Sequence, residues 1–180
     1  MLTNNKYTPI FLALESDKSK VLNLINNLNS KRLNLKPKKN KWSLAQILFH
    51  VIKGEQYVYI SFLDALKPGV NLKTIGISAS IKSFILNWSL KTNIKFKAPP
   101  IAQKVPETVN TKELLNKWDE IRNGINDVCN KLPKEKQNKG VFKHPFIGMT
   151  NLNQTLKFLL FHLKHHLKQI EELSISLKPN

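Results

Sequence analysis

Apolar residues recur at intervals of three and four along four stretches of the chain, the spacing that places them on one face of an α-helix. The first predicted helix begins at Thr8 as N-cap, with Pro9 at the first helical position, and ends near Ser30. The second begins at Ser43, where Gln46 three residues later completes a capping box, and continues to residue 66.

The last two stretches lie in the C-terminal half of the chain. The third helix is predicted to start near Asn110 and to end before Pro133, and the fourth to follow Thr150 or Asn151 as N-cap. Between the second and third helices the pattern is weaker. Residues 81–88 are expected to form a short helix, and residues 94–106 an extended connection that crosses the bundle.

These elements predict an all-α fold, a four-helix bundle with a long crossover between helices 2 and 3. A chain of 180 residues is long enough for one sizeable core and too short to require two. We therefore expect residues 1–180 to form a single helical-bundle domain.

Composition favours an ordinary globular protein over a membrane protein. With 41% hydrophobic residues, the chain contains no uninterrupted apolar run near the roughly 18 residues of a membrane span. The polar start over residues 1–7 lacks the pattern of a cleaved signal peptide. The single cysteine, Cys129, has no partner for an intramolecular disulfide, and a buried apolar role is favoured over a reactive thiol. A cytoplasmic location without a membrane partner is the expectation.

The formal charge of +17 raises the alternative of a nucleic-acid-binding bundle. Almost all of this charge is lysine, and only Arg32 and Arg122 offer the planar guanidinium suited to bidentate contacts. The lysines are spread along a chain that is also rich in asparagine, as a biased nucleotide composition would produce. Compositional bias is thus favoured over a nucleic-acid partner, although the charge could also steer an anionic small molecule towards a site.

Histidines provide the clearest candidate chemistry. His162 and His166 are four residues apart in the last predicted helix, so they project from nearly the same face and can chelate one ion. His165 points about 100° away from His166 and is expected to face solvent. On the second helix, His50 is the candidate third ligand, because neighbouring helices lie about 8–10 Å apart.

Each histidine also has an alternative role. A lone His50 would be a hydrogen-bonded core residue. The pair on the last helix, taken by itself, is equally consistent with a metal site and with two histidines that bind no metal. Three imidazoles together leave coordination positions open, which is typical of a catalytic centre. Zn²⁺ and Ni²⁺ are the expected ions, with Fe²⁺ and Mn²⁺ as alternatives. Gln46, Glu55 and Gln169 are near in sequence, but no catalytic or cofactor-binding residue is assigned.

Three segments together resemble the DinB/YfiT-like superfamily. They are residues 42–50 (WSLAQILFH), 144–150 (HPFIGMT) and 162–170 (HLKHHLKQI), within a resemblance that spans roughly residues 8–175. In that family a capped second helix supplies one metal histidine and the last helix a pair four apart, which carries over to His50, His162 and His166. For His144, which heads a recurrent His-Pro-x-x-Gly element, a turn-forming role is favoured over substrate contact.

The resemblance implies a four-helix bundle with a divalent metal, frequent homodimers, and either thiol transfer or hydrolysis. Relatives of the first kind use bacillithiol, mycothiol or glutathione, and nothing in this sequence selects one of these thiols. The leading hypothesis is a metal-dependent enzyme that activates a low-molecular-weight thiol or water towards a small substrate. The alternatives are a metal-binding stress or interaction protein without turnover and, less favoured, a basic nucleic-acid-binding bundle.

Overall fold

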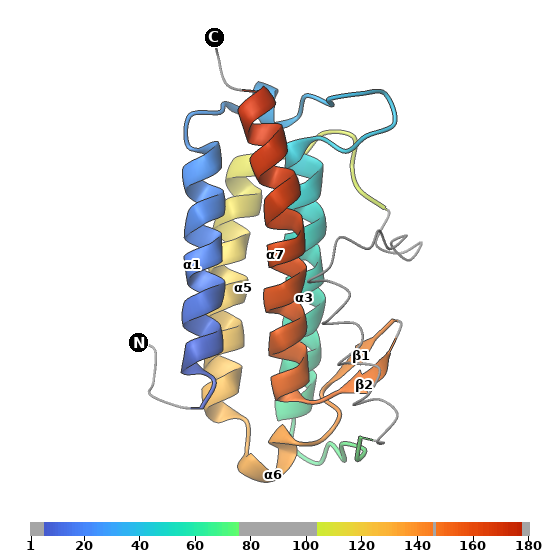
Figure 1. The fold of residues 1–180 in the computed structure, drawn as a ribbon. Helices are drawn as coiled ribbons and strands as arrows, with labels where there is room; N and C mark the ends of the chain where they lie inside the picture. The colour runs from blue at the N-terminus through green and yellow to red at the C-terminus, as the bar shows by residue number, and fades with distance from the viewer. Residues whose placement is uncertain (1–5, 76–103, 146, 178–180) are drawn as a thin grey trace.

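Four long helices lie side by side in the computed structural model, which describes residues 6–75, 104–145 and 147–177 (Figure 1). They are α1 (Thr8–Ile25), α3 (Leu44–Leu66), α5 (Thr111–Lys131) and α7 (Leu152–Ser176). Contacts are most numerous between α1 and α7, between α3 and α5, and between α3 and α7. The predicted all-α four-helix bundle is confirmed.

The direction of the helices explains the long crossover. Figure 1 shows α1 and α7 running upward and α3 and α5 running downward, so that α3 and α5 are parallel neighbours. Parallel neighbours cannot be joined by a short turn, because the chain must return along the length of the bundle. The predicted short helix at 81–88 and most of the predicted extended connection at 94–106 lie outside the described residues.

Short elements lie at the two ends of the bundle and beside α3 (Figure 1). They comprise α2 (Ser30–Leu33), α6 (Lys134–Gln137) and a hairpin of β1 (Phe142–His144) and β2 (Gly148–Thr150). The two strands are antiparallel, with Phe142 opposite Thr150 and His144 opposite Gly148. Gly148 has a φ of 82°, a left-handed conformation that glycine adopts without strain. The hairpin brings His144 against the bundle just before α7 begins.

Side-chain caps fix where three of the long helices begin. Ser43 and Gln46 form the predicted capping box of α3, and Asn151 forms a second one with Gln154 at the start of α7. At α5, the side chain of Asn110 accepts a hydrogen bond from the backbone N–H of Glu113. These starts agree with the sequence-based predictions, with Asn151 chosen over Thr150.

The first helix differs from its prediction at both ends. Its N-cap is Tyr7, which makes no side-chain cap, rather than Thr8. It ends at Ile25 rather than near Ser30, because Asn29 caps the backbone N–H of Arg32 and starts the separate helix α2. Asparagine side chains favour such local caps and turns over a helix interior. Leu28, which lies beyond the end of α1, is buried nonetheless. The apolar spacing therefore identified a core residue although the helix ends before it.

A buried ion pair joins three helices inside the bundle. Arg122 of α5 donates to Glu55 of α3 at 2.7 Å and to Glu15 of α1 at 3.0 Å. The indole N–H of Trp118 donates to the same Glu55 carboxylate at 2.9 Å. Glu55 and Arg122 are 1% and 3% exposed, so these hydrogen bonds replace the water that both charges have lost. The network fixes α3 relative to α5.

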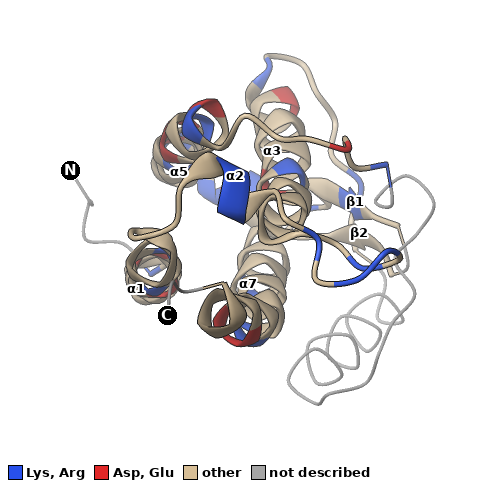
Figure 2. Cartoon of the chain, turned by 90° about the horizontal axis from the view of Figure 1, so that it is seen from above, with Lys and Arg blue, Asp and Glu red and all other residues tan. Residues whose placement is uncertain are grey.

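Basic residues do not gather on one element of the described chain. Figure 2 shows them on α2, on α5, near β1 and on the connections, with acidic residues among them on α5. None of the described helices is both long enough and apolar enough to cross a bilayer. Burial raises the pKa of the Cys129 thiol to about 12, in keeping with its predicted apolar role.

Candidate metal centre

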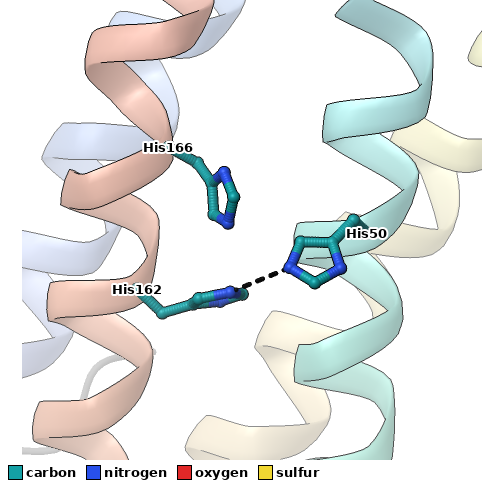
Figure 3. A group of neighbouring side chains, drawn as sticks. All are labelled: His50, His162 and His166. Carbon is teal, nitrogen blue, oxygen red and sulfur yellow. Dashed lines mark hydrogen bonds between the residues drawn. The ribbon is translucent and has the colours of Figure 1, made fainter. Parts of the chain in front are cut away.

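Three histidines from two helices meet in the bundle. His50 extends from α3, and His162 and His166 extend towards it from α7 (Figure 3). One ring nitrogen from each side chain lies within 4.8 Å of the other two. The structure therefore brings together the three residues that the sequence singled out.

Local sequence explains this convergence. The capping box at Ser43 fixes the start of α3, so His50 lies two turns into the helix on the side that packs against α7. The spacing of four places His162 and His166 one above the other on α7. The ring centroids are 4.7 to 5.1 Å apart, and the rings meet edge to face.

The closest approach joins two ring nitrogens. Nε2 of His50 lies 3.1 Å from Nε2 of His162, as the dashed line in Figure 3 marks. Zinc–imidazole bonds of about 2.0–2.1 Å in a tetrahedral site place two ligand nitrogens about 3.3 Å apart. The observed separation is close to this value, so the pair fits a shared ion.

A hydrogen bond sets the orientation of the third ring. Nδ1 of His166 lies 3.0 Å from Oε1 of Gln169, one turn further along α7. Because an amide oxygen only accepts, Nδ1 carries the proton and Nε2 keeps its lone pair for a metal. Metal-binding histidines commonly have such a partner on the second ring nitrogen. Sequence reasoning named Gln169 but assigned it no role.

Aromatic contacts orient His162 instead. Its ring stacks on Phe158 with centroids 5.4 Å apart and an angle of 22° between the planes. The ring of His144, in the hairpin, meets the ring of Phe158 edge to face, with centroids 4.5 Å apart. Trp42 lies 5.2 Å from the ring of His50. Phe158 was not identified from the sequence, because its apolar position resembles any other core residue.

Burial keeps the rings on α7 neutral. Loss of water lowers the pKa of His166 to about 3, with the charge of His50 adding to the effect. Burial, followed by the neighbouring histidines, lowers the pKa of His162 well below its usual value of 6.5. At neutral pH both side chains are therefore uncharged, the form in which imidazole binds metal.

The other candidates have separate roles. His165 is partly buried rather than fully solvated, because its ring rests 5.2 Å from that of His166. His144 is buried at the hairpin and lies outside the cluster, and burial lowers its pKa to about 4. Gln46 caps α3 and donates to the carbonyl of Pro106. Glu55 pairs with Arg122. Of the three polar residues considered beside the site, only Gln169 contacts a histidine of the cluster.

The fold has a counterpart among solved structures. YfiT from Bacillus subtilis, described as a probable metal-dependent hydrolase with an unusual four-helix bundle topology, superposes with a TM-score of 0.64. The match covers 98% of this chain and 90% of that one at 18% identity, which establishes similarity of fold.

Sequence comparisons agree with this result. The uncharacterized protein YuaE of Bacillus subtilis strain 168 is 25% identical over 151 residues, covering 84% of this chain and 88% of the relative. A family model described as the DinB superfamily matches residues 13–170, nearly the whole described bundle. The chain belongs to the DinB superfamily.

Proposed function

We propose that this protein is a divalent-metal-dependent enzyme whose ion is held by His50, His162 and His166. The observation that carries the proposal is the convergence of three ring nitrogens within 4.8 Å, on rings that burial and hydrogen bonding keep available as ligands. Three protein ligands are typical of catalytic rather than structural zinc sites. Zn²⁺ and Ni²⁺ are among the ions that imidazole ligands suit.

The side chains around the site each have a defined part in this proposal. His50, His162 and His166 supply the donor nitrogens. Gln169 holds the proton on Nδ1 of His166, and Phe158 restrains the ring of His162. A divalent ion bound there supplies a Lewis acid that lowers the pKa of a coordinating water or thiol.

The proposed reaction is attack of an activated water or low-molecular-weight thiol on a small substrate. Hydrolysis has the additional support of the YfiT description, whereas no contact in the described structure favours a thiol over water. Thiol transfer is therefore the alternative reaction proposed for the same site. The two are distinguished by whether turnover of a small electrophile requires an added thiol.

Metal content tests the proposal directly. We expect untagged protein, purified without chelator, to contain about one equivalent of Zn²⁺ or Ni²⁺ by elemental mass spectrometry. His162→Ala should lose most of this metal, because two ligands form a much weaker site than three. His165→Ala is the matched control, since it removes a histidine from the same turn of α7 that is not one of the three proposed ligands.

Three results would count against this function. Equal metal in wild type and His162→Ala would show that the ion binds elsewhere. No metal in wild type, even after addition of excess Zn²⁺ or Ni²⁺, would leave three neighbouring histidines without an ion and favour the interaction-protein alternative. Metal without turnover would favour a metal-binding stress protein.

Other expectations remain predictions of the family resemblance or of composition. These predictions are a homodimer, a single domain over residues 1–180, a cytoplasmic location and the absence of a nucleic-acid partner. Light scattering of the full chain addresses the first. Titration with duplex DNA at two salt concentrations addresses the last, because binding through lysines weakens steeply as salt rises.

A further inference from the structure

Gly54 lies one helical turn after His50 in the middle of α3, on the side of the helix that faces the histidine cluster. A Cβ atom at this position would lie 3.7 Å from Cε1 of His162. Beyond its own turn of α3, no other described atom lies within 4 Å of that point. The missing side chain of Gly54 therefore leaves space directly beside a proposed metal ligand.

Packing and backbone conformation do not explain this glycine. A glycine inside a helix destabilises it relative to alanine. Positive φ is confined, among the described glycines, to Gly69 and Gly148. Gly124 of α5 offers the contrast, because a Cβ there would lie 2.3 Å from the ring of Tyr59. At Gly54 the distance of 3.7 Å is an ordinary contact, so alanine would fit.

Part of the cluster remains accessible to solvent. His50, Gly54 and His162 are partly exposed, whereas His166 is buried. Side chains on a helix lean towards its N-terminus and cover the preceding turn. A long side chain at position 54 would therefore lie over the turn that carries His50, between solvent and the donor nitrogens.

We propose that Gly54 sets the size of the molecule that can approach the ion. The absence of a side chain admits ligands that carry a bulky organic group next to their donor atom, such as an aryl thiolate. Gly54 is in this respect a specificity-determining residue. The inference rests on the proposed function, because it concerns access to the ion held by His50, His162 and His166.

Ligand binding to Co²⁺-loaded protein tests this inference without any assay of turnover. The small probe is azide and the bulky probe is thiophenolate, each followed by the change in the Co²⁺ absorption spectrum. We expect wild type to bind both. Gly54→Leu should keep its Co²⁺ and its affinity for azide, and should bind thiophenolate about tenfold or more weakly, the cost of a steric overlap.

Two further variants complete the design. Gln56→Leu places the same leucine side chain about 200° away around α3 and should bind both probes as wild type does. Gly54→Ala should raise the melting temperature of the metal-free protein by about 2–4 °C, because alanine favours the helix and the space admits it. A lower melting temperature would show that the position is tightly packed and would overturn the inference.

The remaining outcomes separate the two proposals. If wild type takes up no Co²⁺, the proposed metal function fails. If wild type takes up Co²⁺ but Gly54→Leu binds thiophenolate as well as wild type does, only the role of Gly54 fails. Equal weakening of azide and thiophenolate in Gly54→Leu would likewise overturn selection by size, as would a Co²⁺-loaded wild type that binds neither probe.

Discussion

A single hydrogen bond decides which nitrogen of His166 is available to a metal. With Gln169 accepting from Nδ1, the ring presents Nε2 towards His50 and His162. The neighbouring His162 has no hydrogen bond in the described structure other than the one to His50, and its ring rests on Phe158. The two histidines of one helix are thus oriented by different means, a polar contact and an aromatic one.

Loss of the amide at position 169 should weaken the site. We expect Gln169→Leu to lower Zn²⁺ affinity about 10- to 100-fold, because the ring of His166 loses the partner that fixes its tautomer. Competition with a chromogenic chelator measures this affinity. Gln169→Glu keeps an acceptor oxygen and should bind Zn²⁺ at least as well as wild type. Unchanged affinity in Gln169→Leu would show that packing alone orients His166.

At the scale of elements, the site depends on how α3 lies between its neighbours. α7 contributes two histidines and α3 one, so a shift of α3 would separate the donor nitrogens. The Glu55–Arg122 pair holds α3 against α5 one residue beyond Gly54. Neither charge belongs to the cluster, yet both act on the position of the helix that carries His50.

Removing one charge of this pair should be costly. We expect Arg122→Met to lower the free energy of unfolding by about 3–5 kcal/mol, because it leaves the Glu55 carboxylate buried without its partner. Urea unfolding of the metal-free protein measures the change. Arg122→Met combined with Glu55→Leu should recover most of the loss. If the double variant is as unstable as the single one, the cost lies in packing rather than in the unpaired charge.

At the scale of the whole molecule, buried neutral histidines make folding sensitive to acid. The pKa of His144 is about 4 in the folded protein and 6.5 when exposed, with burial as the cause. The unfolded chain thus binds this proton more readily, so the stability present above about pH 6.5 is lost as pH falls towards 4. The lowered pKa of His166 acts in the same direction.

Acid sensitivity should therefore decrease when His144 is replaced. We expect metal-free wild type to lose roughly 2–3 kcal/mol of stability through His144 between about pH 7 and pH 4.5. His144→Phe retains an aromatic ring against Phe158 and should lose less over the same interval. Urea midpoints at both pH values measure the difference. An identical loss in the two proteins would show that His144 does not contribute.

Local sequence was sufficient for much of this fold. The start of α3 at Ser43, the start of α5 at Asn110 and the spacing of His162 and His166 depend on contacts within a few residues, and they were predicted on that basis. The predicted end of α1 near Ser30 was wrong, because the asparagines after Ile25 allow a turn that apolar spacing does not reveal. The crossover followed from the length of chain between the second and third helices.

The features that follow from the amino-acid sequence are therefore local ones: helix starts, apolar faces and the angle between two histidines on one helix. Tertiary structure alone decided which faces meet. Only the packing of α3 on α7 brings His50 within 3.1 Å of His162, and only the hairpin places His144 against Phe158. The space beside Gly54 likewise has no local signature. These contacts join residues far apart in the chain, and their geometry depends on how whole helices pack rather than on backbone preferences.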